Sequence, residues 1–156
     1  MSYYNNINDL RVAITKQMQS VLKNEVSKSL RDEFKNIIQQ NVYDRYTPSS
    51  YKRRLSGGGL LSKNQMISTN KGTSNIARIF FTTQAKGNPD KYFSQKNGFL
   101  KRIEYGDGSA KPLLGTKQSP YNQPRPFMST LKNSNKQKII VEPLKQGLKN
   151  RGFKTF

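Results

Sequence analysis

The chain has 156 residues, a length that fits one domain, and carries 28 Lys and Arg against 9 Asp and Glu. A formal net charge of +19 with only 33% hydrophobic residues allows a small core and favours polyanionic partners. Because there is no Cys and no His, disulfides, thiolate nucleophiles and the commonest metal ligands and general base are excluded. No apolar run approaches roughly 18 residues and the first residues are polar, so we expect neither a membrane span nor a secretory signal.

The first predicted element is a helix over residues 6–42. Asn6 or Asn8 is the candidate N-cap, and neither Pro nor Gly interrupts the segment. Its apolar residues recur in steps of three and four, the spacing of one helical face: Ile7, Leu10, Ile14, Met18, Val21, Leu22, Val26, Leu30, Phe34, Ile37, Ile38 and Val42. This face packs either on a sheet of the same chain or on a neighbouring subunit, and the sequence leaves both interpretations open.

Residues 43–64 form a predicted basic loop, because Pro48 and the three glycines 57–59 are incompatible with a regular helix. Tyrosines alternate there with cations, a pattern typical of base stacking and phosphate contact. An ordered loop whose aromatic side chains anchor it to the protein body explains the same pattern. The candidate subunit or DNA contacts are Tyr43, Arg45, Tyr46, Tyr51, Lys52, Arg53 and Arg54.

A small sheet is predicted within residues 65–108. Ile76–Thr83 and Phe99–Tyr105 are rich in β-branched and aromatic residues, which favours strands, and Gln65–Thr69 is a weaker partner strand. Gln84–Gly98 is predicted to be a loop, and Gly106-Asp107-Gly108 a turn. These assignments predict a sheet of mainly antiparallel strands.

The last third is predicted to be an extended Pro-rich arm over residues 109–126 and a C-terminal helix over residues 127–152. Four prolines keep the arm out of regular structure. Pro143 should kink or restart the helix, and Gly152 is its candidate C-cap. The whole chain is therefore predicted to be one α+β domain: a long N-terminal helix packed on a small sheet, with a C-terminal helix and long loops.

Catalytic patterns are weak in this sequence. Glycines 57–59 lack the spacing of a phosphate-binding loop, and Ser56 and Ser62 have no His to activate them. Asp90, Glu104 and Asp107 are too scattered to predict a metal-dependent nuclease. We expect no enzymatic activity, no cofactor and no metal.

Three segments, in order, resemble a family of minor tail components of long-tailed bacteriophages, the neck, head–tail joining or tail-completion proteins. The first is residues 42–60, with its Tyr-x-x-Tyr-x-Pro-x-x-Tyr-x-Arg-Arg pattern. The second is residues 99–108, which contain Glu-Tyr-Gly followed by a small residue and Gly. The third is residues 124–128, which contain Arg-Pro-Phe before a helix. The motif residues of the second and third segments are Glu104, Tyr105, Gly106, Gly108, Arg125, Pro126 and Phe127.

The resemblance spans residues 1–152 and implies a small α+β fold that assembles into a ring, commonly a hexamer, at the head–tail junction of the virion. It implies contacts with other neck and tail proteins and with DNA in the channel, and assembly in the host cytoplasm. Residues 86–97 resemble an insertion, and residues 107–123 form a longer loop than the family pattern has.

Two other functions fit the composition. The main alternative is a small basic nucleic-acid-binding protein, which the charge and the alternating Tyr and Arg favour, although no helix-turn-helix, zinc or single-strand-binding motif is present. A ribosome-associated or toxin-like enzyme is a more remote alternative, because the sequence lacks catalytic residues for it.

Overall fold

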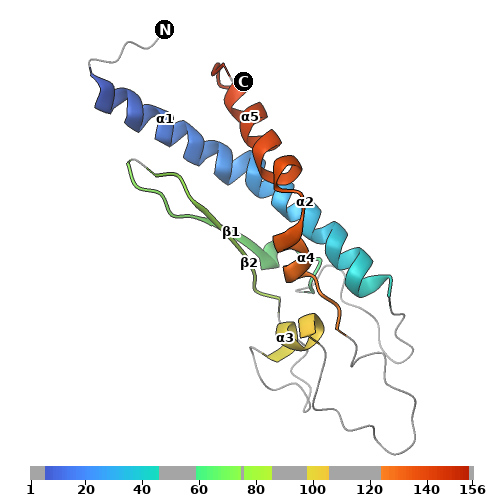
Figure 1. Cartoon of the computed structure of the whole chain (residues 1–156). Helices are drawn as coiled ribbons and strands as arrows, with labels where there is room; N and C mark the ends of the chain where they lie inside the picture. Colours follow the sequence, from blue (N-terminus) through green and yellow to red (C-terminus); the bar gives the residue numbers. More distant parts are fainter. Residues whose placement is uncertain (1–5, 46–58, 75, 86–97, 106–123, 155–156) are drawn as a thin grey trace, which may run out of the picture. The chain divides into compact units, whose positions relative to one another are not determined.

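The computed structural model describes residues 6–45, 59–74, 76–85, 98–105 and 124–154. These residues form an α+β fold with a long N-terminal helix, a two-stranded sheet and C-terminal helices (Figure 1). The chain divides into two compact units. The first unit contains residues 1–32, 67–82 and 135–156, and the second contains residues 33–66 and 83–134.

The N-terminal helix confirms the prediction for residues 6–42. It consists of α1 (Ile7–Val21) and α2 (Ser27–Ile38), joined by a π-helical turn at Leu22–Val26 and followed by another at Gln39–Tyr43. Of the two candidate caps, Asn6 is the N-cap: its side-chain Oδ1 accepts from the Asp9 amide at 2.9 Å. Among the described helices, none is long and apolar enough to cross a bilayer.

The sheet consists of β1 (Met66–Asn70) and β2 (Ile79–Thr83), which confirms two of the three predicted strands. The Lys71 amide donates to the Arg78 carbonyl, and the Gln84 amide donates to the Gln65 carbonyl. Both pairs have residue numbers that sum to the same value, as an antiparallel hairpin requires.

The predicted strand over Phe99–Tyr105 is wrong, because this segment is helix α3 (Gly98–Tyr105). A seven-residue run with few turn residues does not distinguish strand from helix by itself. The segment also contains four good helix formers, Leu100, Lys101, Arg102 and Glu104. The helix places Ile103 and Glu104, which are neighbours in sequence, both in buried positions.

The predicted C-terminal helix over residues 127–152 is present as two helices rather than one. Helix α4 (Met128–Asn133) ends at Ser134, whose backbone is extended. A π-helical turn at Gln137–Val141 then leads into α5 (Glu142–Lys149). Pro143 lies in the first turn of α5, directly after the π-helical turn, and the backbone is helical on both sides of it. The predicted restart therefore does not occur at Pro143, and the break in the C-terminal helix lies at Ser134. Gly152 follows the end of α5 with a φ of 86°, the left-handed conformation expected of a C-terminal glycine.

The core of the first unit lies between the N-terminal helix, the hairpin and α5. Val21 and Val26 are fully buried, and Ile139 is nearly so. The Gln19 amide group donates to the carbonyls of Thr73 and Ile76 at 3.0 and 3.3 Å, which ties α1 to the turn end of the hairpin. The Ser68 hydroxyl bonds to that of Ser27 at 2.5 Å, so this face of the hairpin is directed at the helix.

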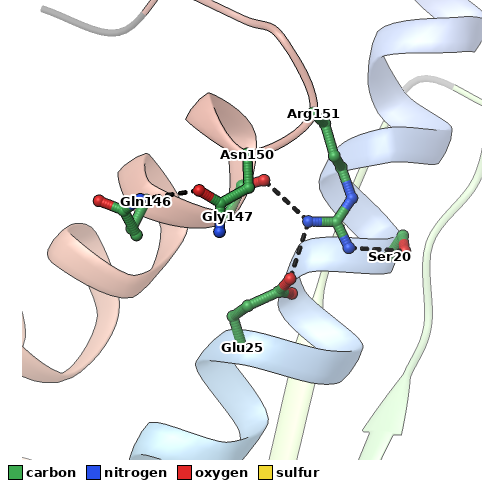
Figure 2. Close-up of polar contacts among 6 residues, drawn as sticks. All are labelled: Ser20, Glu25, Gln146, Gly147, Asn150 and Arg151. Atoms are coloured by element: carbon green, nitrogen blue, oxygen red, sulfur yellow. Dashed lines mark hydrogen bonds and ion pairs between the residues drawn. The ribbon is translucent and has the colours of Figure 1, made fainter.

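Arg151 connects the end of α5 to the N-terminal helix (Figure 2). Its guanidinium donates to Glu25 Oε1 and to the Gly147 carbonyl, both at 2.8 Å, and to the Ser20 hydroxyl at 3.3 Å. Both charged side chains retain partial exposure, 22% for Arg151 and 32% for Glu25. Their main effect is therefore to orient α5, because a solvent-screened pair contributes little free energy.

The core of the second unit is built on the other half of the N-terminal helix. Phe34 and Phe127 are fully buried, with ring centroids 5.8 Å apart and planes inclined by 50°. Such tilted aromatic pairs stabilise beyond their buried area. The remaining buried apolar residues of this unit are Ile37, Ile38, Val42, Leu60, Met66, Ala85 and Ile103.

We predict that Gly147→Ala destabilises the protein by about 1–2 kcal/mol. A Cβ at this position would lie 2.4 Å from Val21 Cγ1, and Val21 is fully buried. Overpacking of this kind costs about 1–3 kcal/mol, more than the helix-propensity gain of about 1 kcal/mol from replacing glycine. Urea unfolding measures the change. The matched control is the double variant with Val21→Ala, which should lose less stability than the two single changes added together; simple additivity would contradict the close contact.

Candidate functional site

The basic loop is only partly described. Tyr43 is the half-buried last residue of the N-terminal helix, and Arg45 is exposed just beyond it. The other five candidate contacts lie outside the described residues, so their role stays a prediction. They are Tyr46, Tyr51, Lys52, Arg53 and Arg54.

The second and third resembling segments meet at the carboxylate of Glu104. Its Oε2 accepts from the backbone amides of Phe127 and Met128 at 2.8 and 2.9 Å. Its Oε1 accepts from the amide and the hydroxyl of Ser129 at 2.8 and 2.6 Å. Glu104 is 5% exposed. A side chain from α3 therefore satisfies the first amides of α4, which Phe127 at the N-cap position cannot do.

Further bonds hold the Arg-Pro-Phe segment in this place. The Arg125 amide donates to the Ile103 carbonyl at 2.8 Å. The Pro126 carbonyl accepts from Asn41 Nδ2 at 2.6 Å and from the Thr130 hydroxyl at 2.9 Å. Phe127 then packs against Phe34 in the core. The segment is fixed from both sides, by α3 and by the end of the N-terminal helix.

The other motif residues are less involved. Tyr105 is 72% exposed, although it follows the buried Glu104 directly. Gly106 and Gly108 lie outside the described residues. The structure thus joins Glu104, Arg125, Pro126 and Phe127 into one cluster and leaves Tyr105 on the surface.

The electrostatics of Glu104 follow from this geometry. Burial raises the pKa of its carboxyl group, but the hydrogen bonds from the Ser129 hydroxyl and from the amides of Phe127, Ser129 and Met128 outweigh burial and bring the pKa below the ordinary value of 4.5. The partial positive charge at the start of α4 acts in the same direction. Glu104 is therefore an ionised acceptor at neutral pH, with four donors already on its two oxygens.

This cluster can position helices but has no evident reacting group. Among the described residues, no group of three or more His, Cys, Asp or Glu is placed to hold a metal ion. The sequence contains one indication of the Glu104 bond. A helix that starts after Arg-Pro-Phe has no Ser, Thr, Asp or Asn at its N-cap and needs an acceptor from elsewhere.

We predict that Glu104→Gln lowers the free energy of unfolding at pH 7 by about 2 kcal/mol, because hydrogen bonds to a charged group are lost. Since the folded pKa of Glu104 is lowered, its contribution is complete above pH 4.5 and is lost as the pH falls through the folded pKa. Urea unfolding over a pH series should show a flatter acid limb in the variant. Glu142→Gln, an exposed first-turn residue of α5, is the matched control and should cost less than about 1 kcal/mol. Equal losses in the two variants would contradict the role of Glu104.

Comparison with known proteins gives one match to a family. No curated protein and no solved structure matches the chain. A family named YomN matches residues 6–150, a range that includes both segments joined at Glu104. The chain therefore belongs to the YomN family, which is phage-associated.

Proposed function

We propose that the chain is a structural virion protein of a tailed phage, a ring-forming neck or tail-completion subunit that joins tail to head and lets DNA pass. The observation that carries the proposal is membership of a phage-associated family over residues 6–150, in a chain with three segments that resemble neck proteins in the same order. The proposed role is non-enzymatic and places the protein at the head–tail junction.

Part of the apolar stripe on α1 is exposed, which supports a contact with a neighbouring subunit. The stripe is fully buried at Val21, but Leu10 is 39% exposed and Ile7 is 79% exposed. Val12, on another side of the same turns, is 46% exposed. Hydrophobic residues gathered on one exposed helix end are typical of protein–protein contacts. A neighbouring copy in a ring would cover them.

The net charge supports a place beside a polyanion. With +19 per chain, a ring of several copies accumulates positive charge that DNA in its channel or acidic neighbouring proteins would neutralise. Electrostatic attraction of this kind guides orientation and assembly more than it adds affinity.

The first test is the mass of the purified chain by light scattering, with and without duplex DNA at moderate salt. We expect a closed oligomer, commonly a hexamer, or a monomer that ignores DNA and joins particles only beside its neighbours. A monomer that binds duplex DNA tightly with a steep salt dependence would instead identify the nucleic-acid-binding alternative.

The second test concerns the basic loop. Replacing Lys52, Arg53 and Arg54 together by Glu should block virion assembly, scored as infectious particles and as tailless heads in electron micrographs. The control variant has the same change in net charge. In it, Glu replaces three exposed cations of the C-terminal region, Lys136, Lys138 and Lys149. If the loop variant assembles normally, these three residues are not contacts.

A further inference from the structure

One face of the hairpin is turned away from the N-terminal helix. Ser68 on β1 is directed at the N-terminal helix, where it bonds to Ser27. The antiparallel register places Thr69 opposite Phe80, and neighbouring residues of a strand point to opposite faces. Phe80 and Thr69 therefore lie on the face that is turned away from the helix. Phe80 is 53% exposed there.

Two cations share this face with Phe80. Lys71 and Arg78 are directly opposite one another in the hairpin, and both are exposed. The Lys71 Nζ lies 5.7 Å from the centre of the Phe80 ring. Residues 66–85 contain no Asp or Glu. The surface is thus an exposed aromatic ring beside two cations, on a hairpin whose own sequence has no acidic residue.

The wider surroundings have the same sign. In the first unit, thirteen Lys and Arg face four Asp and Glu, a formal excess of nine positive charges. This charge favours an anionic occupant of the face over a second, equally basic copy of the chain. An anionic partner with flat apolar groups is complementary to it.

We propose that Phe80, Lys71 and Arg78 on the outward face of the hairpin bind single-stranded nucleic acid. A base stacks on the Phe80 ring, and the two cations contact the adjacent phosphates. Single strands present free base faces, whereas a duplex hides them, and base–aromatic stacking contributes about 1–3 kcal/mol per base. Carboxylate groups alone would contact the cations but would place no flat group on the ring. This site is independent of the proposed ring and of the loop at residues 43–64.

Fluorescence anisotropy of the full chain with a labelled oligo-dT of about 20 nucleotides tests the proposal. We expect Phe80→Ser to weaken oligo-dT binding about tenfold and to leave duplex DNA binding nearly unchanged. Lys71→Gln with Arg78→Gln should reduce the slope of log affinity against log salt by about 1.4, the value for two single-strand phosphates. The matched control for Phe80→Ser is Tyr105→Ser, which removes another exposed aromatic residue. The matched control for the two cations is the pair Lys136→Gln with Lys138→Gln.

Unchanged oligo-dT affinity in Phe80→Ser, or equal losses in the control variants, would overturn the proposal, since the net charge alone would then explain binding. Equal displacement of the oligonucleotide by poly-glutamate of the same charge would also overturn it and would point to an acidic protein partner. These results do not depend on oligomeric state, so they are separate from the test of the ring.

A second measurement does not depend on the stability of Phe80→Ser. The chain contains no Trp, so Phe80→Trp introduces a single reporter that keeps an aromatic ring at the site. Oligo-dT should quench its emission by stacking, and poly-glutamate should not. A rise in anisotropy without quenching would show that the strand binds elsewhere.

Discussion

The apolar stripe of the long N-terminal helix is the constraint on which both units depend. Val21 and Val26 supply buried positions to the first unit, and Phe34 and Ile38 supply them to the second. Each such side chain contributes about 1.5–3 kcal/mol when fully buried. In a chain with 33% hydrophobic residues and a net charge of +19, few other segments offer so many apolar groups in one line. Elements that are distant in sequence therefore form their cores on this helix.

The second unit shows how a polar group can organise such a small core. Burying a carboxylate is unfavourable unless its oxygens are fully hydrogen-bonded. Glu104 meets this condition with three backbone amides and one hydroxyl. The same bonds supply the acceptors that the start of α4 lacks, and this fixes Phe127 against Phe34. The same four hydrogen bonds thus stabilise the buried charge of Glu104 and satisfy the amides at the start of α4.

The first unit exposes two surfaces that differ in chemistry. The first turns of α1 expose aliphatic groups such as Ile7 and Leu10, which suit contact with another protein. The outward face of the hairpin exposes Phe80 beside Lys71 and Arg78, which suits an anion with flat apolar groups. The two proposals therefore assign different partners to different residues, and each can be tested without the other.

The sequence by itself determined the features that depend on local periodicity and local backbone preference. These are the long helix with an Asn cap at its start, the two strands of the hairpin and the left-handed Gly152. Only the tertiary structure decided that Phe99–Tyr105 is a helix and that Glu104 binds the start of α4. A seven-residue segment whose residue types suit either a strand or a helix takes the conformation that its distant neighbours stabilise. Likewise, a carboxylate finds its donors through folding, because 22 residues separate Glu104 from Phe127 in the chain. The sequence predicted Glu104 and Phe127 as motif residues, but the contact between them is non-local, and no local pattern encodes it.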